Sequence, residues 1–462
     1  MPAKATLAGS VTRPTTEKAL ASSLFCRPRD LTRRLPGFLS LSSTIAFACC
    51  APLLVGAWGE PHKAITQAAL AALTDAERAQ LGAELGPLGT QHCLIPDRVY
   101  EGKEVAKYAM MDSHPGVTYL VKLHLPALQP ENYETLRFFM GRSVAAFQAG
   151  NLGDAARYAG TVAHALEDWS CPAHVVPGDN MFTLFQQFLP PPDALRNKLL
   201  HSPIEGGKFD VTIGDFKPTL LGATVDEAAF NLLQRLNAAT ILARAQTIPI
   251  IQALYAGDTN AVTAAQLKAA TKGATVVADA LHTLLCLGAQ QLDAGALAQL
   301  NTVDLSKCCP LEATNLFFAQ ATFFSKPYWG HAHVGGVLEG GSNAVPIKLR
   351  VTENGGVVVK DFASGIGTGT RSALTYLVPT GVYRQFTVLA GLHPELGAKG
   401  GVEFVIFGND KKLASVALTG DQPAHRFDCA LAGVTNLQLV ATAKGGDPKA
   451  NYAIWAEPRL VK

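Results

Sequence analysis

The spacing of the apolar residues changes once along the chain, near residue 300. Before that point they recur three or four residues apart, which is the period of an amphipathic helix. Beyond it they alternate with polar residues in short runs, separated by turns such as Asn354-Gly355 and 408–410. The two periods belong to different kinds of element, so we expect an all-α helical domain followed by an all-β antiparallel sandwich.

The expected elements follow from these periods. Helices are predicted over residues 62–73, 75–85, 133–150, 154–169, 227–257 and 264–292. Strands are predicted within residues 346–362, 382–392, 401–418 and 434–443. The domain boundaries then fall at 58–300 for the helical domain and 311–462 for the sandwich.

The first 57 residues have the composition of an export signal. Four arginines, at positions 27, 29, 33 and 34, precede a nearly uncharged run over 38–57 that ends in Val55-Gly56-Ala57. A basic region, an apolar core and small final residues predict cleavage after Ala57, and the Arg33-Arg34 pair adds a weak twin-arginine pattern. An uncleaved membrane anchor is the alternative, because the run is just long enough to cross a bilayer. We therefore expect a secreted or periplasmic protein.

The charge balance argues against general polyanion binding. Cleavage would remove seven of the 39 basic and two of the 37 acidic side chains, leaving a slight acidic excess. We expect no stable nucleic-acid partner, because such a chain has no general attraction to nucleic acid or anionic lipid. Six cysteines follow residue 57; export permits disulfides, but the spacing determines no pairing.

The sequence HALEDWSCPAH, residues 164–174, brings three candidate ligands together. His164 and Asp168 are four residues apart on a predicted helix, so their side chains lie on one face. Imidazole and carboxylate are ordinary zinc ligands, and His174 follows in a loop that can return to the same site. A helix end with a capping histidine and a solvated aspartate is the structural alternative.

Further candidates occur elsewhere in the helical domain. His62, Asp97 and His114 precede the motif, and a second pair four residues apart is formed by His201 and Glu205. Together with the motif, these histidines and carboxylates predict a metal site.

Two features of the sequence argue against His201 and Glu205 as a ligand pair. Pro203 lies between His201 and Glu205, which makes a regular helix through both doubtful. Ser202 and Glu205 also fit a capping box, which gives Glu205 a purely structural alternative.

These residues resemble the zinc-dependent phospholipases C of bacteria and the related single-strand-specific zinc nucleases. That family has a histidine, an aspartate four residues on and a histidine six further, as at His164, Asp168 and His174. Its mature chain begins with a tryptophan whose amino group and carbonyl bind zinc, and the predicted cleavage leaves Trp58 first. The resemblance covers about residues 58–290.

The resemblance implies two or three Zn²⁺ ions. Its implied ligand sets are Asp97, His114, His164 and Asp168 for one ion, His174, His201 and Glu205 for a second, and Trp58, His62 and the bridging Asp168 for a third. His124 competes with His114, whose distance from the aspartate is closer to the family's.

The chemistry that this resemblance implies is phosphodiester hydrolysis by a zinc-activated water, oriented by Asp97. Glu205 favours a phospholipase C acting on phospholipid, with peripheral membrane contact, whereas the short interval from Trp58 to His62 is closer to the nucleases. We expect the phospholipase, with a single-strand-specific nuclease or nucleotidase as the alternative. An alternative of another class is a non-catalytic carbohydrate- or envelope-binding protein that has lost a ligand, and metal content distinguishes the two classes.

The C-terminal residues 361–392, 402–418, 433–446 and 451–460 resemble the NPCBM type of carbohydrate-binding module. The resemblance implies a β-sandwich of jelly-roll type and a glycan partner. The alternative is a sandwich that only packs on the catalytic domain or an envelope surface. The aromatic side chains available for stacking on a sugar are Tyr328, Trp329, Tyr452 and Trp455, but buried core aromatics are commoner, so none of them is assigned as a binding residue.

Overall fold

The computed structural model describes residues 59–100, 129–175, 201–310, 312–315, 320–321, 332–339 and 343–462. The predicted export segment lies outside these residues, as do Trp58, His114 and His124. The backbone of His201 is described, whereas its side chain is not.

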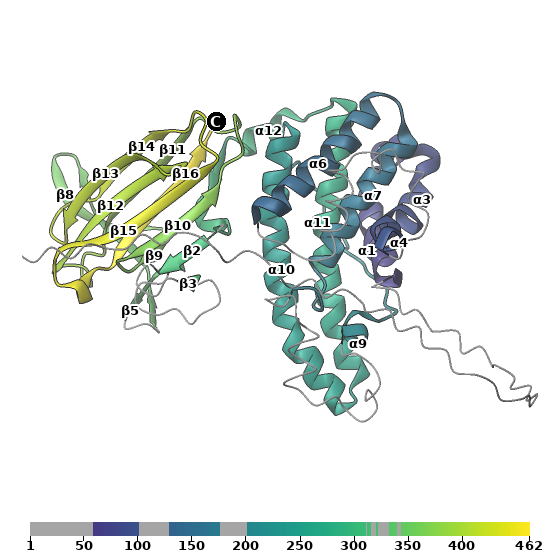
Figure 1. The fold of residues 1–462 in the computed structure, drawn as a ribbon, viewed down its shortest axis with the longest axis horizontal. Helices are drawn as coiled ribbons and strands as arrows, with labels where there is room; N and C mark the ends of the chain where they lie inside the picture. The colour runs from purple at the N-terminus through teal and green to yellow at the C-terminus, as the bar shows by residue number, and fades with distance from the viewer. Residues whose placement is uncertain are drawn as a thin grey trace, which may run out of the picture. The chain divides into compact units, whose positions relative to one another are not determined.

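Helices occupy the described chain up to Gln299, and strands dominate from Thr302 onward, which confirms the predicted fold class (Figure 1). The helices are α1 (Gly59–Ala71), α2 (Asp75–Leu81), α3 (Leu85–Thr90), α4 (Ile95–Tyr100), α6 (Gln129–Gln148), α7 (Leu152–Asp168), α9 (His201–Glu205), α10 (Val225–Ala256), α11 (Thr259–Ala289) and α12 (Ala294–Gln299). Short 3₁₀ turns η1 (Gly82–Glu84) and η2 (His92–Leu94) join the early helices. No described helix is both long enough and apolar enough to cross a bilayer.

The short helices α3, α4 and α12 were not predicted, and two further regions differ from the sequence-based prediction. The helix expected over 75–85 ends at Leu81, because Gly82 takes a positive φ of 51° that an α-helix does not allow. Residues His201–Glu205 do form a helical turn, so the doubt that Pro203 raised was wrong. Pro203 is the third residue of this turn, and the first turn of a helix needs no backbone N–H donor there.

The long helices α10 and α11 run side by side as a hairpin (Figure 1). Gly257 ends α10 in the left-handed region, with φ of 69°, and Asp258 then caps α11 by accepting a hydrogen bond from the Ala261 N–H. A glycine after one helix and an aspartate before the next are the usual terminators. This hairpin supplies side chains that hold the candidate site.

Within the described residues, the sandwich consists of two antiparallel six-stranded sheets. One has the order β14-β11-β16-β9-β4 with β1 also on β16, and the other has the order β13-β12-β15-β10-β2-β3. Their strands are β1 (Thr302–Asp304), β2 (Glu312–Asn315), β3 (Gln320–Ala321), β4 (His333–Val334), β9 (Gly365–Thr368), β10 (Ser372–Leu377), β11 (Gln385–Leu392), β12 (Gly400–Gly408), β13 (Lys411–Thr419), β14 (His425–Ala430), β15 (Asn436–Gly446) and β16 (Ala453–Val461). Two separate hairpins are β5 (Val337–Glu339) with β6 (Asn343–Val345) and β7 (Ile347–Glu353) with β8 (Gly356–Phe362).

Turn chemistry and core packing explain this sandwich. Asn354 and Gly355 both have positive φ, 51° and 80°, which is the two-residue turn that closes the β7–β8 hairpin. Trp455 on β16 is fully buried and packs edge-to-face on Phe404 of β12, with ring centroids 5.1 Å apart. The aromatic residues therefore fill the space between the two sheets.

Candidate metal centre

Helix α7 carries two of the candidate ligands at its C-terminal end. Its N-terminus is capped by Asn151, whose side chain accepts a hydrogen bond from the Asp154 N–H. His164 and Asp168 lie one turn apart, and both are 0% exposed. Burial of this kind excludes the alternative of a solvated aspartate at a helix end. A buried carboxylate is costly unless a counter-charge accompanies it, so something at this position must compensate for it.

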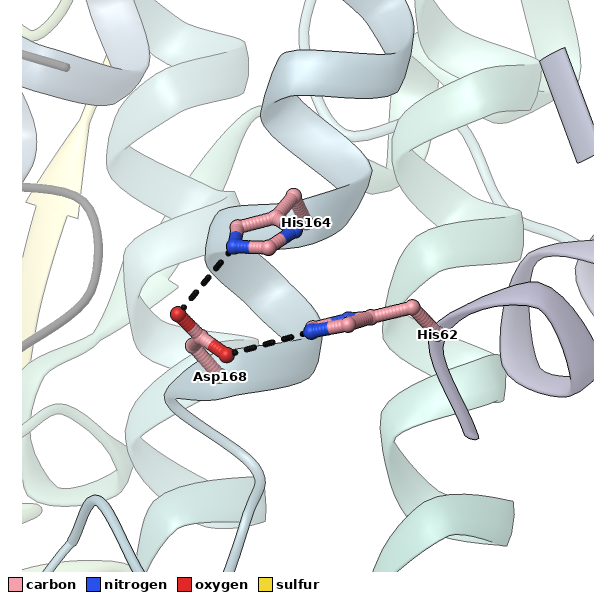
Figure 2. Close-up of side chains that lie close together, drawn as sticks. All are labelled: His62, His164 and Asp168. Atoms are coloured by element: carbon pink, nitrogen blue, oxygen red, sulfur yellow. Dashed lines mark ion pairs between the residues drawn. The ribbon is translucent and has the colours of Figure 1, made fainter. Parts of the chain in front are cut away.

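Asp168 connects two histidines from different helices (Figure 2). Its Oδ2 lies 3.3 Å from Nε2 of His164, and its Oδ1 lies 3.5 Å from Nε2 of His62 on α1. The two imidazole rings are stacked, with centroids 4.1 Å apart. His62, His164 and Asp168, here called the central cluster, each offer a ligand atom within 4.8 Å of the others.

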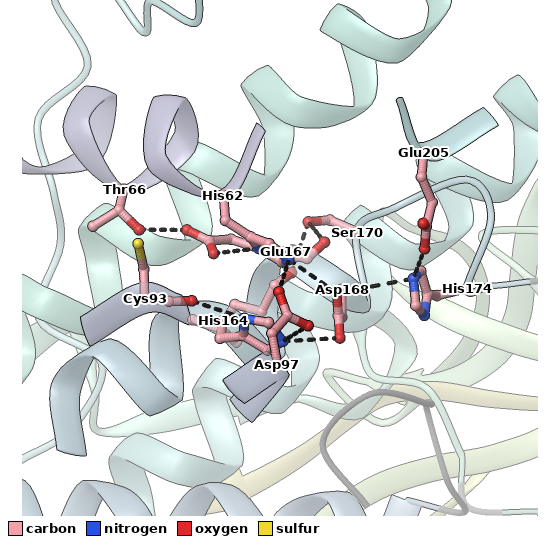
Figure 3. A network of polar contacts seen from close by, with 11 residues as sticks. His62, Thr66, Cys93, Asp97, His164, Glu167, Asp168, Ser170, His174 and Glu205 are labelled. Carbon is pink, nitrogen blue, oxygen red and sulfur yellow. Dashed lines mark hydrogen bonds and ion pairs between the residues drawn. The ribbon is translucent and has the colours of Figure 1, made fainter. Parts of the chain in front are cut away.

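The other nitrogen of each ring is held by an outer partner (Figure 3). Nδ1 of His164 donates to the carbonyl oxygen of Cys93 at 2.8 Å, and a carbonyl can only accept, so Nε2 of the neutral ring carries the lone pair. Nδ1 of His62 lies 2.7 Å from Oε2 of Glu167, and the Thr66 hydroxyl donates to Oε1 of the same carboxylate at 2.5 Å. Such outer partners orient histidines as metal ligands.

Asp97 faces the central cluster from α4. Its Oδ1 is 3.7 Å from Nε2 of His164, and its Oδ2 is 4.0 Å from Nε2 of His62. The Asp97 side chain is 15% exposed, in contrast to the fully buried Asp168. Of the two carboxylates, Asp97 is the one that solvent can reach.

A second group of candidate ligands, here called the outer cluster, consists of Cys171, His174 and Glu205. Nε2 of His174 is hydrogen-bonded to Oε1 of Glu205 and lies 3.9 Å from Oδ1 of Asp168. The same aspartate therefore adjoins both clusters, as Figure 3 shows. That position is the one that a bridging ligand needs.

The α10–α11 hairpin fixes the outer cluster. On α10, the Thr240 hydroxyl donates to the Trp169 carbonyl at 2.7 Å, and Arg244 Nε donates to the Val175 carbonyl at 2.6 Å. On α11, the buried Gln266 amide donates to carbonyls at the end of α9, including that of Ile204 at 2.8 Å. These contacts position the segment that carries His174 and the turn that carries Glu205.

The buried side chains of the two clusters perturb one another's pKa values. Burial alone disfavours a charged His164, but the carboxylates around it, Asp168 foremost, raise its pKa to about 10. Burial also raises the pKa of Glu167 well above its usual range, although the Thr66 hydroxyl opposes the shift. A divalent cation bound here would offset the charge of the same carboxylates.

The structure thus brings together six sequence-predicted residues: His62, Asp97, His164, Asp168, His174 and Glu205. Their roles as ligands remain predictions, and Trp58, His114 and the His201 side chain are not placed. Glu167 and Thr66 are site residues that were not predicted from the sequence. Glu167 is adjacent to Asp168 and points to another face of α7. Its hydrogen-bond partners, His62 and Thr66, are on α1, so they are known only once the packing of α1 against α7 is known.

A known domain family matches only the C-terminal part of the chain. Residues 327–461 match the NPCBM/NEW2 domain family. No curated protein sequence matches significantly.

Three solved structures illustrate the similarity. The CBM51 module of Clostridium perfringens GH95, in complex with methyl-galactose, is 22% identical over 35% of this chain and 99% of that chain, with a TM-score of 0.28. A structure of CBM51-2 and INT domains from Clostridium perfringens ZmpB, in complex with GlcNAc, is 21% identical over 35% of this chain and 31% of that chain, with a TM-score of 0.29. The alpha toxin of Clostridium absonum is 13% identical over 82% of this chain and 84% of that chain, with a TM-score of 0.33.

The first prediction concerns the outer partner of His62. We expect Glu167→Gln to weaken zinc binding by about 10–100-fold, because a cation on His62 would favour the charged carboxylate as the acceptor of its Nδ1–H, and an amide stays neutral. Since burial already disfavours the charged form of Glu167, the neutral replacement should still fold. Zinc affinity is measured by competition with a chelator. Glu134→Gln, at a 48% exposed side chain on α6, is the matched control, and equal affinities in all three proteins would contradict the prediction.

A second prediction concerns the close approach of η2 to α7. This approach brings the Cys93 carbonyl within hydrogen-bond distance of His164. A Cβ on Gly160 would lie 2.5 Å from the backbone carbonyl carbon of His92, so Gly160→Ala must displace η2. We expect a loss of about 1–3 kcal/mol in the free energy of unfolding. Denaturant unfolding is the measurement.

Gly153 on the same helix provides the control. No atom would come closer than 3.7 Å to its new Cβ, so Gly153→Ala should be neutral or stabilising by up to about 1 kcal/mol. If both variants behave alike, the close packing of η2 is not what requires glycine at position 160.

Proposed function

We propose that this chain is an exported zinc-dependent phosphodiesterase of the phospholipase C type. The observation that carries the proposal is the central cluster: two histidine Nε2 atoms face the two oxygens of one fully buried carboxylate. Both Nδ1 atoms are engaged elsewhere, so the rings are oriented as ligands are. The donor set, nitrogen and carboxylate oxygen, is the one that zinc takes in hydrolytic sites.

The candidate ligands of the central and outer clusters would hold separate metal ions. His62, His164 and Asp168 would hold metal in the central cluster, and His174 with Glu205 would hold metal in the outer cluster. Asp168 lies within 4 Å of histidines in both clusters, which suits a bridging ligand. Zinc in such a site lowers the pKa of a bound water to near neutrality and stabilises phosphate oxygens.

Asp97 has the position of a proton acceptor. Both of its oxygens lie near the histidine nitrogens of the central cluster, yet the side chain still reaches solvent. In the proposed reaction one oxygen of Asp97 faces the cluster, and the other accepts a hydrogen bond from the attacking water and then its proton. The buried Asp168 has no comparable access.

The substrate is tested by parallel assays on the zinc-loaded, exported protein. We expect release of the phosphorylated headgroup from phosphatidylcholine vesicles and no degradation of single-stranded DNA. Degradation of DNA without lipid hydrolysis would establish the nuclease alternative, which the short interval from Trp58 to His62 favours. A chain that retains fewer than two zinc ions and hydrolyses neither substrate would support a non-catalytic binding protein.

We further propose that the sandwich binds a glycan and so holds the enzyme near a surface. The match of residues 327–461 to the NPCBM/NEW2 family supports this role. Trp455 takes no part in it, since its ring is fully buried in the core. Titration of the protein with galactose and with N-acetylglucosamine tests the proposal, and failure to bind any member of a broad glycan panel would leave the sandwich as a structural partner.

A further inference from the structure

A third group of metal-ligating side chains lies outside the candidate centre. Glu77 on α2 meets His282 and Cys286, which are one turn apart on α11, and their ligand atoms lie within 4.8 Å of one another. Nδ1 of His282 is hydrogen-bonded to Oε1 of Glu77. Sγ of Cys286 lies 3.8 Å from each ring nitrogen.

The carboxylate of this group is held in place before any ligand arrives. Oε2 of Glu77 accepts hydrogen bonds from the backbone N–H and the hydroxyl of Thr74, both at 2.8 Å, in the capping box of α2. Oε1 is thereby directed at His282. The side chains of Glu77 and His282 are 11% and 23% exposed, so an ion can reach them from solvent.

We propose that Glu77, His282 and Cys286 form an additional zinc site that ties α2 to α11. A carboxylate, an imidazole and a thiolate are all zinc ligands, and two of them one helical turn apart can enter the same coordination shell. Water takes the fourth position. Calcium and magnesium are disfavoured, because they require six or more oxygen ligands.

Small movements convert the observed arrangement into a site. Zinc binds nitrogen and oxygen at about 2.0–2.2 Å and sulfur at about 2.3 Å. Nδ1 of His282 and Oε1 of Glu77 therefore move apart from hydrogen-bond distance to admit the ion, while Sγ of Cys286, 3.8 Å from the ring nitrogens, needs little movement. The ion replaces the hydrogen bond between His282 and Glu77. Burial and the Glu77 carboxylate raise the pKa of Cys286 to about 11, so binding also releases the thiol proton. The site is independent of the proposed activity.

The test uses the full exported chain, stripped of metal and reloaded with cobalt(II). Thiolate ligation gives a sulfur-to-cobalt charge-transfer absorption in the near ultraviolet, which nitrogen and oxygen ligands do not give. We expect this band in the parent protein and in Cys171→Ala, and we expect its loss in Cys286→Ala. Absence of the band from the parent, or its loss only in Cys171→Ala, would overturn the proposal.

Zinc content provides a second measurement. His282→Gln keeps a hydrogen-bond partner for Glu77 but removes the imidazole, so it should bind one zinc ion fewer than the parent after dialysis. It should also retain the parental rate of phosphodiester hydrolysis, because none of the three residues belongs to the central or outer cluster. Unchanged zinc content in both His282→Gln and Cys286→Ala would show that the three side chains form only a packing contact.

Discussion

Asp168→Asn should abolish phosphodiester hydrolysis, with a loss greater than the factor of about 100 that outer partners of a metal can give. The two Asp168 oxygens lie 3.3 Å and 3.5 Å from the Nε2 atoms of His164 and His62. An amide of the same shape has one neutral oxygen and one NH₂ group, so it cannot bridge two ions. Zinc content and hydrolysis of a soluble phosphodiester are measured together, because both should fall.

Asp154→Asn is the matched control for this variant. Asp154 lies in the first turn of the same helix, where it pairs with Arg157 at 2.8 Å and is 22% exposed. We expect parental zinc content and activity from it. Parental activity in Asp168→Asn, with zinc retained, would show that the buried aspartate is not a ligand.

The positions of these ligands could be predicted because their spacing is local. A histidine and an aspartate four residues apart share a helical face in any α-helix, and the Pro172 that follows implies a turn before His174. For the pair His201 and Glu205, Pro203 raised a doubt about a helix that the structure does not support. Pro203 reads as a helix breaker, yet the structure forms a single turn in which proline costs no hydrogen bond.

The outer partners could not be predicted, because they depend on how separate helices pack. The Cys93 carbonyl reaches His164 only because Gly160 lets η2 approach α7. No sequence pattern near Cys93 predicts this hydrogen bond. Glu167 likewise looks like a solvated charge beside Asp168. It is fully buried because α1 brings His62 and Thr66 to its two oxygens.

The sandwich shows the same division. The hairpin at Asn354-Gly355 follows from two residues that tolerate positive φ. Long-range strand order does not follow from local signals. Thr302 pairs with Val461, so β1 joins the last strand of the chain although it lies in the interval between the two predicted domains.

Removal of the first 57 residues should be required for full activity, and this is the second large effect that we expect. A free α-amino group has a lone pair for zinc, whereas the nitrogen of a peptide bond does not. Trp58 lies outside the described residues, but α1 begins at the next residue, Gly59, one turn before His62. We therefore propose that the amino group of a cleaved chain joins His62 in binding the metal. Mass spectrometry of the exported protein should give a chain that begins at Trp58.

A variant with one glycine added before Trp58 tests whether activity requires the free amino group of Trp58 or only the removal of the export segment. The extended chain keeps every side chain of the central cluster, yet its amino group is displaced by one residue, about 3.8 Å along the backbone. We expect it to fold normally, to bind at least one zinc ion fewer than the chain that begins at Trp58, and to lose most of its activity. If it is as active and as rich in zinc as the cleaved chain, the amino group is not a ligand. Among the described residues, the candidate ligands at the central cluster are then the side chains of His62, His164, Asp168 and the neighbouring Asp97, and the role of the first 57 residues is confined to export.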